Sequence, residues 1–167
     1  MSQTTLDIKE PGLNSLPPGV ERYVVEGGGL TGIQILPDDE IEILNNEGNQ
    51  VCEISVFNKD GKSELAILNL KEAKDSSEIK KILFKKDETS LQALLQLKKR
   101  NLNIEKSKSS IVFNTETKAG EKVKFKSKDK CYCIFAAPGN RMMVHEQNPS
   151  TELTITIKRS IIKKDKD

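Results

Sequence analysis

The stretch NNEGNQVCEISVFNKDG, residues 45–61, predicts a turn, a strand and a second turn. Asn and Gly residues open it and Asp-Gly closes it, and both favour chain reversal. Side chains of the strand alternate between two faces, so Cys52, Ile54 and Val56 share the predicted core face. The other face carries Val51, Glu53, Ser55 and Phe57. The stretch therefore predicts a β fold, with a glutamine, a cysteine and a glutamate at the entrance of one strand.

Short β-rich runs lie on both sides of this strand, separated by turn residues such as Gly27–Gly29. They span residues 20–25, 30–36, 40–44, 63–70, 110–114, 121–128, 130–137, 141–145 and 152–160. Several of the runs alternate apolar residues with lysine, glutamate or threonine, which indicates one buried and one wet face. We expect a mainly β fold, an antiparallel barrel or sandwich of about eight to ten strands.

The composition changes to Lys, Glu, Ser, Leu and Gln between about residues 71 and 105, which predicts a helical insertion. It contains two helical pieces, residues 76–84 and 88–101, and Asp87 or Thr89 can cap the second. The second piece carries a stripe at helical spacing, formed by Leu91, Leu94, Leu95 and Lys98. We expect the insertion to pack over a sheet edge or one barrel mouth.

The chain of 167 residues fits one domain with its own core. Residues 1–17 are polar and without periodicity, so we expect a flexible N-terminal arm. Residues 18–160 form the predicted single β domain, and residues 161–167 a charged tail.

Composition argues against several classes of protein. The formal charge is only +2 and aromatic residues make up 4%, without tryptophan, so we expect no nucleic-acid binding. No apolar run approaches the roughly 18 residues of a membrane span, and residues 1–12 do not resemble a secretory signal. Three cysteines, an odd number, favour reduced thiols. We expect a cytoplasmic protein with no membrane partner.

The strongest candidate for a metal site consists of Cys52, Cys131, Cys133 and His145. Cys131 and Cys133 point to one face of a strand, and a neighbouring strand could bring His145 beside them, a donor set that suits zinc. However, C-x-C is less specific than paired C-x-x-C, and free cysteine is often buried as a small apolar residue. We therefore expect core cysteines and no metal, with the metal site as the alternative.

His145 could also serve as a base for one of the thiols in a nucleophilic pair. Such a pair needs a thiolate stabilised by a cation or a helix N-terminus. The cysteines lie in apolar strand sequence, where burial raises the thiol pKa. We therefore expect no catalytic residue among them.

After the cysteines, Gln50 and Glu53 are the remaining candidate functional residues in the opening stretch. Glu53 lies either on a half-exposed sheet face, as a solvated strand residue, or at the mouth of a barrel, where a carboxylate could meet a ligand. We expect any binding site to consist of Gln50, Glu53 and Arg141.

The opening stretch resembles the Gly-Asn-Gln, acid, Asn signature of the urea carboxylase-associated family. The matching residues are Glu47, Gly48, Asn49, Gln50, Val51, Cys52, Glu53 and Asn58. This resemblance is local, and no metal or active-site residue of that family carries over from it.

A longer resemblance runs over residues 16–159, to the amino-terminal extension of aminomethyltransferase-like proteins related to the glycine-cleavage T-protein. The matching pieces are residues 16–23, 27–29, 38–43, 47–53, 137–139, 142–143 and 149–159. Members of that family bind tetrahydrofolate and transfer one-carbon units. The resemblance implies that this chain corresponds to their accessory domain.

On this basis we expect a non-catalytic accessory or interaction module associated with a folate-dependent aminomethyltransferase in one-carbon metabolism. The resemblance implies no cofactor in this chain, tetrahydrofolate in the associated catalytic domain, and an aminomethyltransferase domain or subunit as partner. The alternative is a small metal-dependent enzyme or a ligand-binding barrel related to the urea carboxylase-associated family.

Overall fold

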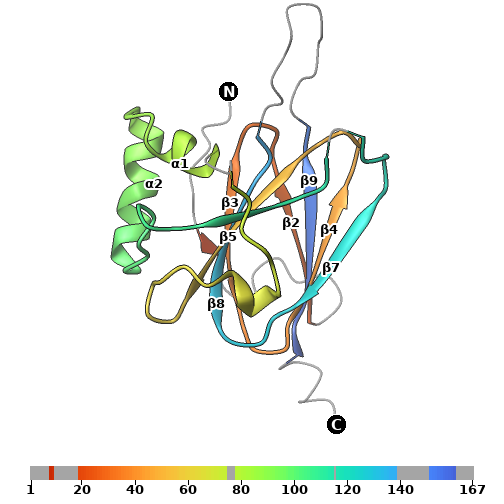
Figure 1. Ribbon diagram of the computed structural model, residues 1–167, viewed down its shortest axis with the longest axis horizontal. Coiled ribbons are helices and arrows are strands. Elements are labelled where there is room, and N and C mark those ends of the chain that lie inside the picture. The colour runs from red at the N-terminus through yellow and green to blue at the C-terminus, as the bar shows by residue number, and fades with distance from the viewer. Residues whose placement is uncertain (1–7, 10–18, 75–77, 115, 139–150, 161–167) are drawn as a thin grey trace, which may run out of the picture.

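The computed structural model describes residues 8–9, 19–74, 78–114, 116–138 and 151–160 (Figure 1). Its strands are β1 (Ile8–Lys9), β2 (Val20–Val25), β3 (Leu30–Ile35), β4 (Glu40–Asn45), β5 (Cys52–Asn58), β6 (Ser109–Val112), β7 (Lys122–Lys126), β8 (Cys131–Ala136) and β9 (Leu153–Lys158). Its helices are the 3₁₀ helix η1 (Leu65–Leu68), α1 (Glu78–Leu83) and α2 (Glu88–Lys99).

The described strands form two sheets that pack face to face. One sheet has the order β1-β3-β8-β5-β6 and the other the order β2-β9-β4-β7. All described pairings are antiparallel except that of β1 with β3. The prediction of a mainly β, antiparallel fold is confirmed, and the architecture is that of a sandwich.

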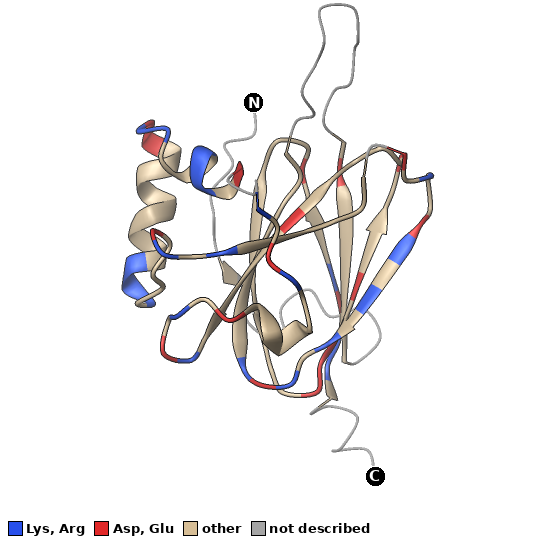
Figure 2. Ribbon diagram, viewed as in Figure 1, with Lys and Arg blue, Asp and Glu red and all other residues tan. Residues whose placement is uncertain are grey.

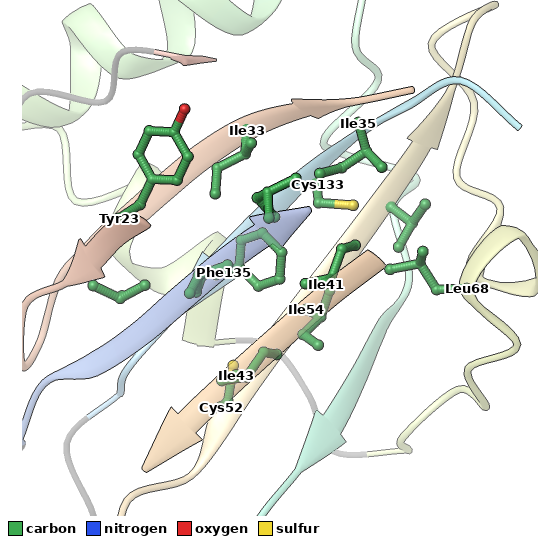
Figure 3. Packing of buried hydrophobic residues seen from close by; sticks show 14 of the residues in the cluster. Tyr23, Ile33, Ile35, Ile41, Ile43, Cys52, Ile54, Leu68, Cys133 and Phe135 are labelled. Carbon is green, nitrogen blue, oxygen red and sulfur yellow. The ribbon is translucent and has the colours of Figure 1, made fainter. Parts of the chain in front are cut away.

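The core between the sheets explains why these strands form. Cys52, Ile54 and Val56 of β5 point into it, as their alternation predicts. They meet Ile41 and Ile43 of β4 from the opposite sheet, and all five are fully buried. Figure 3 shows Cys52, Ile54, Ile41 and Ile43 packed together with labelled side chains of β3 and β8. The period of two in each strand therefore sets which face turns inward.

A third layer covers the outer face of the five-stranded sheet (Figure 1). Ile79 and Leu83 of α1 and Leu97 of α2 pack in one cluster with Phe57 of β5 and Ile134 of β8. The expectation that the insertion covers a sheet edge or a barrel mouth is therefore wrong. Because helices lie on this face, β5 is buried on both sides instead of one.

Residues 63–70 were expected to pair back as a strand, and this prediction is wrong. Leu65–Leu68 form η1, while Ser63 bridges to Phe57 of β5 and the backbone N–H of Glu64 donates to the carbonyl oxygen of Val56 at 2.9 Å. Leu65 and Leu68 fall three residues apart and both are buried, which is the spacing of a 3₁₀ turn. Asn69 then ends the helix in a left-handed conformation with φ of 57°. The predicted strand at 141–145 lies outside the described residues.

The remaining strands follow the predicted runs, and one short strand is additional. β2 matches residues 20–25, and β3, β4, β6, β7, β8 and β9 differ from their runs by a few end residues. β1 lies within the stretch expected to be a flexible arm and pairs in parallel with Gly32 and Ile33 of β3. The lysines of β7 lie on an edge strand, where charge discourages strand addition by another chain.

Candidate functional site

Gln50 occupies the point where the chain enters β5, and its side chain joins two distant segments. Its Nε2 donates to the carbonyl oxygens of Pro138 at 2.7 Å and Val51 at 2.8 Å. Its Oε1 accepts a hydrogen bond from the backbone N–H of Thr151 at 2.8 Å. The side chain is 1% exposed. Gln50 therefore holds the end of β8 and the start of β9 together.

The turn before Gln50 is built by residues that tolerate left-handed backbone. Gly48 and Asn49 have φ of 80° and 60°. A Cβ at Gly48 would lie 2.6 Å from the backbone nitrogen of Ala119 and 2.8 Å from the carbonyl oxygen of Thr117, so a larger residue does not fit without a shift. Asn45 closes the turn by donating from Nδ2 to the carbonyl oxygen of Gln50 at 2.8 Å. The Gly-Asn pair of the signature is thus accounted for by the geometry of this turn.

Glu53 lies fully buried on the outer face of the sheet, beneath α1. Its Oε2 accepts a hydrogen bond from the backbone N–H of Ile79 at 2.6 Å. Burial raises the pKa of Glu53, although hydrogen bonds from the backbone of Ile79 and Glu78 and from Ser109 act in the opposite direction. The reading of Glu53 as a solvated strand residue or a group at a barrel mouth is wrong, because α1 covers this face. Glu53 instead ties α1 to β5.

Gln50 and Glu53 therefore hydrogen-bond to different parts of the fold. Gln50 contacts the ends of β8 and β9, whereas Glu53 contacts the first turn of α1. Arg141, the third predicted binding residue, lies outside the described residues. A binding role for the three residues stays a prediction.

The cysteines are all free and buried. The Sγ atoms of Cys131 and Cys133 lie 3.7 Å apart, and Ser127 Oγ lies 3.6 Å from the Cys131 Sγ. Cys52 belongs to the neighbouring strand β5. Within the described residues, no three His, Cys, Asp or Glu side chains gather in a set that could hold a metal ion. His145 lies outside those residues, so whether it meets the thiols stays open.

The thiols differ in acidity because they differ in hydrogen bonding. Burial raises the pKa of Cys52 and of Cys133 far above the usual range. A hydrogen bond with Cys133 lowers the pKa of Cys131, despite the burial of Cys131. A raised pKa keeps the thiols of Cys52 and Cys133 protonated at neutral pH, and the thiolate is the nucleophilic form of cysteine.

A buried charge cluster, which the sequence reading missed, crosses the other end of the sandwich. Arg159 donates to both carboxylate oxygens of Glu21, at 2.8 and 2.9 Å, and to Asp39 Oδ2 at 2.6 Å. All three side chains are at most 1% exposed. Tyr23 adds a hydrogen bond from its hydroxyl to Glu21 Oε1 at 2.5 Å. This cluster fixes the start of β2 and the loop before β4 to the end of β9.

Alternation could have revealed the cluster. Glu21 shares the inward face of β2 with Tyr23 and Val25, and Arg159 continues the inward face of β9 after Ile155 and Ile157. Two opposite charges on inward faces of two strands predict an ion pair, because buried charges are otherwise too costly.

An open groove of about 390 Å³ lies beside the helices. It is lined by Phe84, Leu94, Leu97, Lys98, Asn101, Leu102, Asn103, Ile104 and Glu105. Apolar side chains form much of the wall and Lys98, Asn101, Asn103 and Glu105 supply polar groups. The volume falls in the range of pockets that hold small molecules or a partner's side chain.

None of the helices in the described part of the chain is long and apolar enough to cross a membrane.

Comparison with known proteins gives one informative relative. No family model matches the sequence. The chain is 34% identical over 157 residues to a trimethylamine-oxide aldolase from Ruegeria pomeroyi. The alignment covers 93% of this chain and 20% of the relative, so the chain spans about one fifth of the length of the protein that it matches.

This relative corrects the family prediction. It bears the name of an enzyme, a trimethylamine-oxide aldolase, and not of an accessory domain of an aminomethyltransferase. Three expectations are therefore wrong: the assignment to the glycine-cleavage T-protein relatives, the function as a non-catalytic module in folate metabolism, and the view that the chain is not catalytic on its own. The tetrahydrofolate cofactor and the partner subunit that went with that assignment stay untested predictions.

Proposed function

We propose that this chain belongs to an enzyme of the trimethylamine-oxide aldolase type and contributes to its catalysis. The observation that carries the proposal is the 34% identity that extends over 93% of the chain. A match of this extent takes in most of the chain, and is not confined to a turn or one strand.

The proposed reaction balances without a further reactant. Trimethylamine oxide, C₃H₉NO, yields formaldehyde, CH₂O, and dimethylamine, C₂H₇N. One N–CH₃ bond and the N–O bond break, the methyl carbon is oxidised to the aldehyde, and the nitrogen is reduced from N-oxide to amine. The electrons released by the carbon are those that the nitrogen takes up, so no external oxidant is required.

The hydrogen bonds of Gln50 suggest how it would serve such an enzyme. It binds Pro138 and Thr151, the described residues on either side of residues 139–150 in the sequence. In this proposal Gln50 is a positioning residue that holds Pro138 and Thr151 in place. The three free thiols accord with a cytoplasmic location, which forms part of the proposal.

The experiment that tests the proposal replaces the matching 157-residue segment of the Ruegeria enzyme by this chain. The chimera is incubated with trimethylamine oxide, and formaldehyde and dimethylamine are measured. A Ruegeria enzyme from which the segment has been deleted serves as the control. We expect the chimera to form both products faster than the control, and equal rates would contradict the proposal.

A further inference from the structure

Three large apolar side chains of the helical layer face solvent. Leu91 and Leu95 of α2 are 55% and 53% exposed, and Phe84, which follows α1, is 41% exposed. Leu91 and Leu95 lie four residues apart and so share one face of the helix. We call these three residues, with the adjoining groove, the α2 surface.

The groove extends this surface. Phe84 belongs to both the exposed set and the groove wall, and Leu94 lines the groove next to Leu95 in the helix. Leu102 and Ile104 complete the apolar wall from the loop that follows α2. An apolar side chain of a partner would find contacts on several sides here.

The fold of the chain itself does not require the exposed leucines. The residues of α2 that turn inward are Ser90, Ala93 and Leu97. The stripe at helical spacing named above starts at Leu91, one residue after the buried Ser90. Its Leu91 and Leu95 lie on the outside of the layer. A helix that is apolar on two faces is expected where a second surface is covered.

Basic residues outnumber acidic ones in the helical layer, although Glu105 also lines the groove. Residues 78–100 contain seven Lys or Arg and three Asp or Glu, whereas the whole chain carries a formal charge of only +2. Figure 2 shows the middle turns of α2 without charge and Lys and Arg gathered at its C-terminal end. Lys98 lines the groove itself. Acidic groups on a partner surface would complement Lys98, Lys99 and the other basic residues of this layer.

We propose that the α2 surface binds the remaining part of a trimethylamine-oxide aldolase-type enzyme, through an apolar side chain in the groove and acidic groups opposite Lys98 and Lys99. This inference rests on the proposed function. The relative carries about four fifths of its length outside the segment matched by this chain, so the matched domain there has a large protein body as its neighbour. Trimethylamine oxide has five non-hydrogen atoms and is much smaller than the open groove.

A first experiment uses the chain as it is. Sedimentation of the purified full chain distinguishes a monomer from a dimer over a range of concentrations. We expect a monomer. If the chain is instead a dimer, the double variant Leu91→Glu with Leu95→Glu and the variant Val24→Glu are compared. Dissociation of the dimer by the double variant but not by Val24→Glu would overturn the proposal, because the α2 surface would then bind a second copy.

A second experiment measures hydrogen exchange of the α2 amides in the free chain and in the chimera described above, where the tether raises the effective concentration of the partner. We expect exchange within Glu88–Lys99 to slow by about tenfold or more in the chimera, equivalent to about 1.4 kcal/mol. Protection of β5 and β8 amides in both samples shows that the domain is folded. Unchanged α2 exchange with protected strands would overturn the proposal.

Matched variants separate docking from folding. Leu91→Glu with Leu95→Glu is expected to remove the added protection of α2 in the chimera. Val24→Glu changes a similarly exposed apolar residue, 47% exposed on β2, and is expected to leave that protection in place. Equal effects of the two changes would contradict the proposal. Product formation with unprotected α2 would overturn this inference alone, whereas protected α2 without product would overturn the proposed function alone.

Discussion

Arg159 and Glu21 lie 138 positions apart in the sequence and form a bidentate pair inside the sandwich. The two parallel hydrogen bonds, of 2.8 and 2.9 Å, match the planar fork of the guanidinium to the carboxylate. Asp39 binds the remaining Nη1, so the cluster has one positive and two negative charges. Burial alone would lower the pKa of Arg159, but the hydrogen bonds and charges of Glu21 and Asp39 raise it overall. The guanidinium group is therefore charged at neutral pH.

Replacement of Arg159 by methionine is expected to destabilise the protein by about 3–5 kcal/mol, because two carboxylates remain buried without their partner. Urea denaturation at neutral pH measures this loss. Lys122→Met is the control, since Lys122 makes an exposed ion pair with Glu42 at 3.8 Å that contributes little. Losses of similar size in the two variants would show that the buried cluster does not hold β9 in place.

Glu53→Gln is expected to change how stability depends on pH. Burial raises the pKa of Glu53 above its ordinary value of 4.5, so the folded state binds a proton more tightly than the unfolded state. Glu53 therefore lowers the free energy of unfolding progressively as the pH rises from 4.5 through the raised pKa. Glutamine lacks this titration and keeps an oxygen that can accept from Ile79.

The measurement is the free energy of unfolding of both proteins at about pH 5 and about pH 8. The stability of the glutamine variant relative to the natural protein should increase between the two values. The other titrating groups are common to both proteins and cancel in the difference. A difference that is the same at both pH values would mean that Glu53 does not titrate as described.

Gly48→Ala tests the turn that leads into β5. Both Gly48 and Gly120 have positive φ, 80° and 87°, so alanine is strained at either position. A Cβ at Gly48 also meets backbone atoms of Ala119 and Thr117, whereas a Cβ at Gly120 meets nothing within 4 Å. We expect Gly120→Ala to cost about 1–2 kcal/mol and Gly48→Ala distinctly more. Equal losses of stability in the two variants, measured by thermal or urea denaturation, would show that the contact with the backbone of Ala119 and Thr117 is not what requires glycine at position 48.

Gln50→Ala is expected to destabilise the protein by about 1–3 kcal/mol, because the carbonyl oxygen of Pro138 and the N–H of Thr151 lose a buried partner. Gln50→Glu is a useful comparison, since its carboxylate can still accept from Thr151 but cannot donate to Pro138. Hydrogen exchange at Thr151 should quicken in the alanine variant and change less in the glutamate variant. Slow exchange in both would show that Gln50 does not join β8 to β9.

The parts of the fold that the sequence predicts well are those in which one local rule decides the outcome. In β4, Ile41 and Ile43 alternate with exposed or half-buried glutamates, and the strand lies where alternation places it. In β5 the inward face of Cys52, Ile54 and Val56 was likewise predictable. The failures occur where another layer changes the environment. The alternation of side chains along a strand could not show that α1 covers Glu53, nor that Leu65 and Leu68 pack as a 3₁₀ turn.

The candidate site was less predictable than the fold, for a similar reason. Gln50 was singled out from its type and position, but its partners at Pro138 and Thr151 are 88 and 101 residues away. Alternation places Glu21 and Arg159 on inward faces of their strands, but local sequence does not determine that β2 pairs with β9. The α2 surface contains leucines that a helical period alone assigns to a core, and their exposure follows from the shorter Ala93 and Ser90 facing the sheet.

The most direct test of the proposed function follows carbon-13-labelled trimethylamine oxide by NMR in the presence of the chimera. We expect formaldehyde, as its hydrate, and dimethylamine to appear in equal amounts as the N-oxide disappears, without an added oxidant or reductant. Loss of the N-oxide signal no faster than with the Ruegeria enzyme that lacks the segment would contradict the proposed function.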